Sequence, residues 1–251
     1  MRYYVVSDVH SFYSHMITAL TDAGYYKDTE PHKLIICGDF FDRGPEPLEM
    51  QNFILSHLEA DDVILITGNH EQLLYELATK DKGVAYQHHL YNGTWKTGVA
   101  FADLPNEIAY MYNEEFASLL KTKPFFKEIL PKCRNYYEAE HYIFVHGWIP
   151  ISSRKGKIIY KPDWRDASAK KWKEAVWHNG MDMACKYHIT EPGKTIVCGH
   201  WHTSYGHSVY EGKGEEFGAD ADFSPFKADG ILAIDACTAY SGKVNCVVIE
   251  D

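Results

Sequence analysis

The sequence LIICGDFFDRG, residues 34–44, passes from four apolar residues directly into a glycine-flanked turn that carries two aspartates and an arginine. A short apolar run that ends at glycine is typical of a buried strand. Four further segments end in the same way and place Asp, Asn or His at the turn: VVSDVH (5–10), VILITGNHE (63–71), YIFVHG (142–147) and TIVCGHWH (195–202). Because ligands bind beyond the carboxyl ends of strands in open α/β sheets, we expect an α/β fold in which these five turns meet at one site.

The polar residues of these turns have the composition of a metal site. Seven of them are candidate ligands, namely Asp8, His10, Asp39, Asn69, His146, His200 and His202. Carboxylate, amide and imidazole groups without a thiolate favour Mn, Fe, Co or Zn over an all-oxygen Mg or Ca site. Seven ligands exceed the needs of one ion that keeps a position open for water, whereas two ions that share a carboxylate use them all. We therefore predict two divalent ions, with Mn favoured over Fe, Zn or Co, and Asp39 as the shared ligand.

The alternative interpretation is that these residues only shape turns. Any single Asp, Asn or His beside a glycine is more typical of a turn or a helix cap, since these side chains bond to the local backbone. The metal prediction rests on five occurrences at the same place in a strand-then-loop unit. His207 lies further along the last loop, with no strand directly before it, and is interpreted as a supporting or solvent-facing residue.

The same turns carry residues suited to phosphoryl transfer. Two divalent ions lower the pKa of a bridging water, so that hydroxide can attack phosphorus in line without a covalent nucleophile. Arg43 offers a planar fork for the non-bridging oxygens. His70 can protonate the leaving alkoxide with Asp42 orienting it, although Asp42 and Arg43 could instead form only a turn ion pair. The candidate phosphate contacts are Arg43, Asn69 and Arg165.

In combination, the motifs resemble the calcineurin-like metallophosphoesterase superfamily, and within it the serine/threonine phosphoprotein phosphatase branch. The motifs are DVH at 8–10, GDFFDRG at 38–44, GNHE at 68–71, VHG at 145–147 and GHWH at 199–202. The segment 234–244 looks like the closing hairpin of that family, and GHW at 199–201 is similar to bacterial diadenosine tetraphosphatases. The resemblance implies a β-sandwich of two mixed sheets flanked by helices, with a helical cap insertion.

The resemblance also implies how the ligands divide between the ions, and it gives the imidazole–carboxylate pair the same acid role. The first ion would be held by Asp8, His10 and Asp39. The second ion would be held by Asp39, Asn69, His146 and His200. In the wider superfamily the last histidine of the GHxH motif, here His202, also binds the first ion, whereas in phosphoprotein phosphatases that place is usually not a ligand. Both options stay open for His202.

These observations predict a metal-dependent phosphatase of the serine/threonine protein phosphatase type, which hydrolyses phosphate monoesters by attack of a hydroxide that bridges two ions. The substrate would be a phosphoprotein, a small phosphate ester or a nucleotide. An alternative is a pyrophosphohydrolase of dinucleoside polyphosphates such as diadenosine tetraphosphate, which Trp201 favours. A third is a non-catalytic metal-binding scaffold. Ser7, Ser11 and Trp148 stand where relatives often have smaller residues, which would narrow the entrance and counts against folded phosphoproteins.

Length and composition indicate the number of domains, the class of partner and the cellular location that we expect. A chain of 251 residues that is 45% hydrophobic suffices for a single domain over 1–251, with helical or cap insertions at 84–140 and 150–194. A net charge of −10 argues against an extended nucleic-acid surface. We expect a cytoplasmic protein without membrane contact, because the chain opens in a strand and no run approaches 18 apolar residues. The six cysteines form no CxxC pair and are expected to be reduced. The sequence does not predict an oligomeric state.

The segments between the strands read as helices. Apolar spacings of three and four predict helices at 12–20, 48–58 and 71–79, with Pro45 at an early helical position of the second. The tryptophans of 164–183 predict core packing, or a cap whose aromatic rings stack on a substrate base. The Gly- and acid-rich stretch 207–229 is typical of a surface loop.

Overall fold

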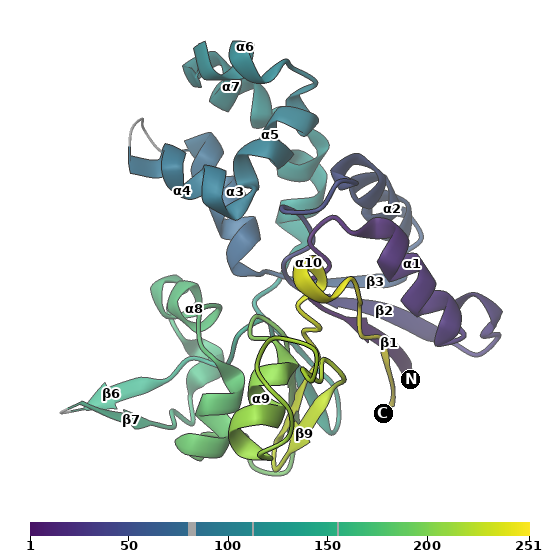
Figure 1. The fold of residues 1–251 in the computed structure, drawn as a ribbon, viewed down its shortest axis with the longest axis vertical. Helices are drawn as coiled ribbons and strands as arrows, with labels where there is room; N and C mark the ends of the chain where they lie inside the picture. Colours follow the sequence, from purple (N-terminus) through teal and green to yellow (C-terminus); the bar gives the residue numbers. More distant parts are fainter. Residues whose placement is uncertain (80–83, 112, 155) are drawn as a thin grey trace.

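A computed structural model of the chain describes residues 1–79, 84–111, 113–154 and 156–251. Two sheets form its centre and helices lie outside them (Figure 1). The two ends of the chain lie side by side, since the backbone N–H of Asp251 donates to the carbonyl of Met1. Within the described ranges, no helix is both long and apolar enough to cross a bilayer.

The first sheet holds three of the predicted strands in parallel. Its order is β11-β1-β2-β3, with β1 at Arg2–Val6, β2 at His32–Cys37, β3 at Val63–Ile66 and β11 at Val247–Glu250. Strands β1, β2 and β3 run parallel, and β11 pairs antiparallel with β1. The polar turns that follow β1, β2 and β3 therefore emerge at the same edge, as the sequence predicts.

The second sheet supplies the other two predicted strands. Its order is β4-β5-β8-β10-β9, with β4 at Tyr137–Glu138, β5 at Tyr142–Phe144, β8 at Thr195–Cys198, β10 at Ile231–Ala233 and β9 at Phe226–Ala228. The middle strands β5, β8 and β10 run parallel, whereas the two edge strands are antiparallel. The expected sandwich of two mixed sheets is confirmed.

The two sheets pack face to face through every second side chain of their strands. Tyr3 and Val5 of β1 face the second sheet and pack in one buried cluster with Phe144 of β5 and Val197 of β8. Successive side chains of a strand point to opposite faces, so the intervening residues of β1 pack under the helices instead. Each sheet thus has one face in the sandwich and one face under helices.

The first three helices follow the predicted apolar faces. Helix α1 spans Tyr13–Asp22, α2 spans Pro47–Glu59 and α3 spans Asn69–Thr79. The prediction for Pro45 is wrong, because Pro47 is the proline at the start of α2. The backbone N–H groups of Gly44 and Glu46 donate to the carbonyls of His10 and Ser11, which holds Pro45 in the loop against the first turn.

The helical insertion stands above the first sheet (Figure 1). It comprises α4 at Val84–Asn92, α5 at Thr94–Ala102, α6 at Asn106–Met111, α7 at Asn113–Leu120, a π-helical turn at Phe125–Ile129 and a 3₁₀ turn at Leu130–Lys132. Trp95, Phe101 and Phe116 pack from these helices into the cluster that lies over the first sheet. The end of the predicted range 84–140 differs, because it contains the edge strand β4.

The second insertion is only partly helical. It begins with a hairpin of β6 at Ser152–Arg154 and β7 at Lys157–Ile159, and continues with a 3₁₀ turn at Trp164–Asp166, α8 at Ala169–Ala175 and a π-helical turn at Asp182–Lys186. Trp164 and Trp172 are buried in the core of the second sheet, as the packing interpretation predicts, whereas Trp177 is 45% exposed.

Two expectations, for the loop 207–229 and for the closing hairpin at 234–244, differ from the structure. Part of the predicted loop 207–229 is regular, since α9 spans Thr203–Tyr210 and β9 lies at its other end. The expected closing hairpin is not a hairpin: β10 and β11 belong to different sheets and are joined through α10 at Thr238–Ser241. The connection carries the chain from one layer of the sandwich to the other, past the carboxyl ends of the strands.

Candidate functional site

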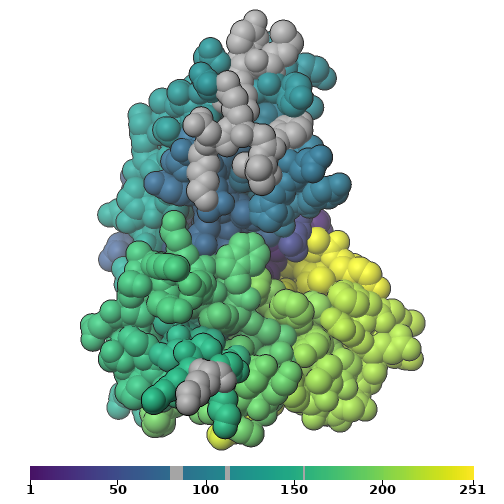
Figure 2. All heavy atoms as spheres, turned by 90° about the vertical axis from the view of Figure 1, so that its left-hand side faces the viewer, coloured from purple at the N-terminus to yellow at the C-terminus, as the bar shows by residue number. Residues whose placement is uncertain are grey.

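The predicted turns meet at one pocket of about 250 Å³ at the carboxyl ends of the strands. Four of the five turns contribute predicted residues to its walls: Asp8, His10, Asp39, Arg43, Asn69, His200 and His202. His146 lies buried behind this wall, within ligand distance of Asp39. On the face drawn in Figure 2, purple atoms of the amino-terminal segment lie at the junction between the blue helices above and the green and yellow segments below.

The turns adopt backbone conformations that few residues tolerate. The backbone angle φ lies between 50° and 74° at Asp8, His10, Asp39 and Asp42. Further site residues in other turns have φ in the same range. Asp and His occupy this left-handed region more readily than bulky or branched residues do. Such strained positions cluster at functional sites, where the surrounding structure holds them in place.

Two glycines allow the turns to approach one another. A Cβ atom at Gly68 would lie 2.2 Å from Oδ1 of Asp39, and a Cβ atom at Gly199 would lie 2.0 Å from Oδ2 of Asp8. Both distances are far below a van der Waals contact. The glycines of the GNHE and GHWH motifs are therefore required for the carboxylates of neighbouring turns to reach their positions.

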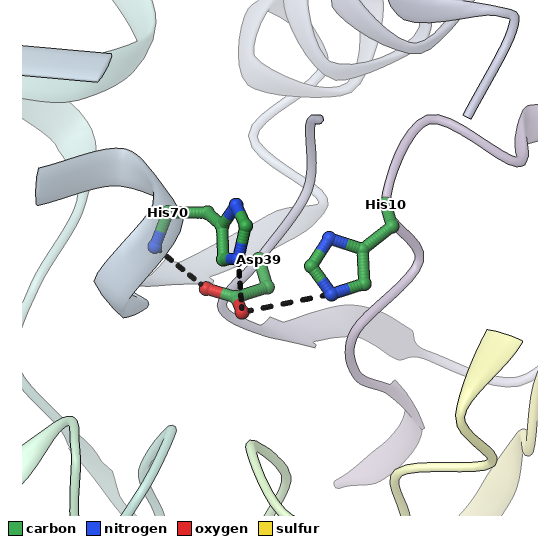
Figure 3. Close-up of side chains that lie close together, drawn as sticks. All are labelled: His10, Asp39 and His70. Carbon is green, nitrogen blue, oxygen red and sulfur yellow. Dashed lines mark hydrogen bonds and ion pairs between the residues drawn. The ribbon is translucent and has the colours of Figure 1, made fainter. Parts of the chain in front are cut away.

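Asp39 lies between His10 and His70 (Figure 3). Its Oδ2 atom is 3.7 Å from Nε2 of His10 and 3.9 Å from Nε2 of His70, and its Oδ1 atom accepts the backbone N–H of His70 at 2.9 Å. Nδ1 of His10 lies 3.0 Å from the carbonyl of Phe41 and donates to it, which leaves Nε2 as an acceptor directed at Asp39. This is the arrangement that orients metal-bound histidines in proteins.

A second group of ligand atoms surrounds the other oxygen of Asp39. Asp39, His146 and His200 bring their ligand atoms within 4.8 Å of one another. Nε2 of His146 lies 3.3 Å from Oδ1 of Asp39 and 2.8 Å from Oδ1 of Asn69. Because Nδ1 of His146 donates to the carbonyl of Cys37 at 2.8 Å, its Nε2 lone pair faces two oxygen lone pairs. Three converging acceptors repel one another unless a proton or a cation lies between them, and a divalent ion would satisfy all three, so the residues present fit a metal ion.

One oxygen of the Asp8 carboxylate accepts two hydrogen bonds. Its Oδ2 atom accepts the backbone N–H of His200 at 2.9 Å and the hydroxyl of Ser7. Burial raises the pKa of Asp8 to about 7, and the pKa of Asp39 is raised well above its usual range by burial and by the nearby Asp8 and Glu71. Both carboxylates therefore disfavour an uncompensated negative charge, and a divalent cation supplies the compensation.

The histidines of the site are held in the form that binds metals. Burial lowers the pKa of His146 to about 4 and that of His200 to about 3, and it lowers the pKa of His10 well below the usual range. Neutral imidazole is the form that coordinates metal ions. The pocket thus combines crowded carboxylates with neutral imidazoles, which is the electrostatic pattern of a metal centre.

His70 and Asp42 form a buried pair beside the metal ligands. Nδ1 of His70 lies 2.6 Å from Oδ2 of Asp42, and the hydroxyl of Thr94 in α5 donates to the same oxygen at 2.7 Å. Burial raises the pKa of Asp42 to about 7. Arg43 approaches the other ring nitrogen, with 3.3 Å between its Nη2 and Nε2 of His70. Within the described part of the chain, Asp42 is therefore the partner of His70 and does not form the alternative turn ion pair.

One predicted residue lies away from the pocket, and another lines it with a carboxylate partner of its own. Arg165 does not line the pocket, because its guanidinium is bound by Glu138 of β4 at 2.6 Å and by Glu191 of the second insertion at 2.8 Å. We therefore do not retain Arg165 as a phosphate contact. His202 does line the pocket, but its Nε2 atom lies 2.9 Å from Oε1 of Glu216. His207 is buried in α9 between Glu211 and the carbonyl of Ser224, which makes it structural.

Five further residues line the pocket: Asn92, Trp177, Trp201, Asp235 and Cys237. The sequence predicts an aromatic contribution from Trp177 and Trp201, but it misses the other three. Asp235 carried a usable signal, since ILAID at 231–235 is a sixth apolar run that ends at an aspartate. Asn92 comes from the helical insertion and has no such signal.

Comparison with known proteins shows which family the chain resembles. A family model described as "Calcineurin-like phosphoesterase" matches residues 1–204. The bis(5'-nucleosyl)-tetraphosphatase PrpE [asymmetrical] of Bacillus subtilis (strain 168) is 30% identical over 132 residues, which cover 50% of this chain and 52% of that protein. The protein of the same name from Bacillus velezensis is 36% identical over 81 residues, 30% of this chain and 32% of that protein. The chain spans about half the length, or less, of these curated relatives.

Solved structures agree on the fold. A putative diadenosine tetraphosphatase superimposes with a TM-score of 0.50 at 13% identity, covering 99% of this chain and 89% of that one. A cold-active protein-tyrosine phosphatase of a Shewanella species superimposes with a TM-score of 0.52 at 16% identity, covering 100% of this chain and 75% of that one. At such identities the likeness concerns the fold alone. The family match over most of the chain, together with the ligand geometry at the strand ends, shows that this protein belongs to the calcineurin-like phosphoesterase family.

Proposed function

We propose that the protein is a metal-dependent hydrolase that splits dinucleoside polyphosphates, with two Mn ions as its cofactors. The observation that carries the proposal is Asp39, whose two oxygens lie between two separate groups of histidine nitrogens. One ion would be held by Asp8, His10 and Asp39, and the other by Asp39, Asn69, His146 and His200. When bound, the ions would supply an activated water and neutralise charge on the phosphate.

The remaining steps belong to side chains of this chain. Arg43 lines the pocket and can bind the non-bridging oxygens of the phosphoryl group, which gain charge as the bond breaks. His70 would give a proton from Nε2 to the leaving oxygen. Burial and the nearby Arg43 lower the pKa of His70 well below its usual range. Asp42, bonded at Nδ1, fixes the ring orientation and would supply the negative charge that favours the protonated imidazole when substrate is bound.

The rim of the pocket supports a nucleotide substrate. Trp177 and Trp201 are 45% and 36% exposed, and their ring centroids lie 5.8 Å and 6.1 Å from that of His200. Exposed indoles beside a phosphate site are suited to stacking on a nucleobase, which contributes about 1–3 kcal/mol per base. The curated relatives bear the name of tetraphosphatases, which points in the same direction.

Phosphate monoesters, including phosphoproteins, form the second candidate substrate class. The motifs at 38–44 and 68–71 favour it by their resemblance to the serine/threonine phosphatases. The same ligands and the same acid would serve both reactions. The two classes differ in what the rim must recognise, since a phosphoserine side chain offers no aromatic ring to Trp177 or Trp201.

A substrate comparison separates the two classes. Protein stripped with a chelator and reloaded with Mn should turn over diadenosine tetraphosphate at a higher kcat/KM than a phosphoserine peptide or p-nitrophenyl phosphate. Trp177→Ala should raise KM for the dinucleotide more than KM for glycerol phosphate. Faster turnover of the phosphopeptide would favour the second candidate. Absence of metal-dependent turnover on every substrate, with Asp39→Asn as the metal-site control, would refute the enzymatic proposal.

A further inference from the structure

Glu71 is a fully buried carboxylate in the first turn of α3. It accepts three backbone N–H groups: that of Asp39 at 2.9 Å and that of Gly68 at 2.8 Å on Oε2, and that of Phe40 at 2.9 Å on Oε1. An ionised carboxylate offers about four lone-pair sites on two oxygens, so three donors can be satisfied at once. Hydrogen bonds of this kind to a charged group are about twice as strong as neutral ones.

These three donors come from two different turns. Asp39 and Phe40 follow β2, whereas Gly68 follows β3 and directly precedes Asn69. A reciprocal bond runs in the opposite direction, since Oδ1 of Asp39 accepts the backbone N–H of His70. The two turns that carry the shared ligand and the amide ligand are therefore cross-linked twice, once through Glu71 and once through Asp39.

The close packing leaves these turns little other freedom. A Cβ atom at Gly68 would meet Oδ1 of Asp39 at 2.2 Å and Oε2 of Glu71 at 2.8 Å. Glu71 does not line the metal pocket. Its contacts therefore reach the ligands through the backbone, and it has no direct contact with a substrate bound in that pocket.

We propose that Glu71 is a positioning residue, which fixes the turn after β2 against the turn after β3 and so sets the spacing of Asp39 and Asn69 on which the paired metal site depends. This inference rests on the proposed metal-dependent function. A carboxylate in a first helical turn can also act only on its own helix. Two of the three donors of Glu71 belong to a different element, and that distinguishes it from such a residue.

Glu71→Gln tests the inference with minimal change of shape. The amide keeps one acceptor oxygen but turns an N–H donor toward a backbone N–H donor, so at least one of the three bonds is replaced by repulsion. Glu191→Gln is the matched control. Glu191 also accepts three donors, with Tyr160 and Trp164 on one oxygen and Arg165 on the other, and it lies outside the metal pocket.

Two measurements are needed, the first of which requires no metal. Amide hydrogen exchange of the metal-free protein should accelerate at Asp39, Phe40 and Gly68 in Glu71→Gln and stay unchanged there in Glu191→Gln. Titration with Mn²⁺ should then show affinity for the ions weakened about 10- to 100-fold in Glu71→Gln, the usual cost of losing a group that supports a metal ligand.

The outcomes separate the inference from the proposed function. Unchanged exchange at the three amides, or equal loss of Mn²⁺ affinity in both variants, would overturn the positioning role. Wild-type protein that binds no Mn²⁺ would overturn the proposed function and with it the metal role, while the exchange rates would still report whether Glu71 joins the two turns. Circular dichroism melting of both metal-free variants checks that the compared proteins are folded.

Discussion

Replacing His70 by Gln removes the ring nitrogen that can pass a proton to the leaving group. In the structure this nitrogen, Nε2, lies 3.9 Å from the shared carboxylate Asp39 and 3.3 Å from Arg43, which places it between the metal ligands and the phosphate contact. The other nitrogen is bonded to Asp42 at 2.6 Å. A glutamine amide can still donate to Asp42, so the change removes the proton donor at Nε2 and its contact with Arg43.

The expected loss follows from the acid role. General acid catalysis typically contributes about 10²- to 10⁴-fold in rate, which corresponds to about 3–5 kcal/mol of transition-state stabilisation. The loss should be largest for an alkyl phosphate, whose leaving alkoxide needs a proton. It should be smaller for p-nitrophenyl phosphate, whose leaving group is stable as an anion.

The assay compares kcat for these two esters in wild-type protein and in His70→Gln, with Mn content measured on the same samples. Equal losses for both esters would refute the acid role and make His70 structural. Loss of an ion from the variant would instead assign His70 to the metal ligands, an outcome that the grouping of His10, Asp39 and His70 makes worth measuring. The acid role requires unchanged metal content together with leaving-group dependence.

Two further predictions concern the backbone and the ion pairs. Gly199→Ala would place a methyl group 2.0 Å from Oδ2 of Asp8. We therefore expect a loss of about 1–3 kcal/mol in the free energy of unfolding, measured by denaturation, and weaker metal binding, measured by metal titration. Wild-type values in both measurements would contradict the close approach. The hydrogen bond from Arg165 lowers the pKa of Glu138 from 4.5 to about 2, so its carboxylate stabilises the folded state above pH 4.5, and that contribution is lost as the pH falls toward about 2. The stability difference between wild type and Glu138→Gln, about 1–2 kcal/mol at neutral pH because solvent screens this partly exposed pair, should therefore shrink in urea titrations across this range, and a constant difference would contradict the ion pair.

The strands and most of the site residues can be predicted from the sequence, because a single local pattern, an apolar run that ends at a polar residue, indicates both. A buried parallel strand is a continuous apolar run, and the residue at its end is forced to the ligand-binding edge. The strand-end pattern thus predicts that Asp39, Asn69 and His146 lie together although they are far apart in the chain. It would also have found Asp235, whose strand has the same pattern.

The errors share a different physical origin. Arg165 has the right chemistry for a phosphate, but two carboxylates more than 25 residues away bind it, and local sequence cannot reveal such partners. Pro45 and Pro47 are equally suited to a helix start, and the choice is made by backbone contacts with the first turn. The sequence does not decide whether His202 is a ligand, and the structure adds a partner, Glu216, from a loop that has no periodic pattern.

Contacts between the turns preform the site in the chain itself. Left-handed residues such as Asp39 and His200 cost on the order of 1–3 kcal/mol each when nothing holds them. Here the turns hold one another, because the N–H of His10 donates to the carbonyl of Asp39 at 2.9 Å and the N–H of Gly199 donates to that of His146 at 2.8 Å. The strain is therefore distributed over several turns that are stable only together. A substitution that frees one turn should loosen the ligands on its neighbours as well, so metal affinity and local backbone order are expected to fall together across a mutant series.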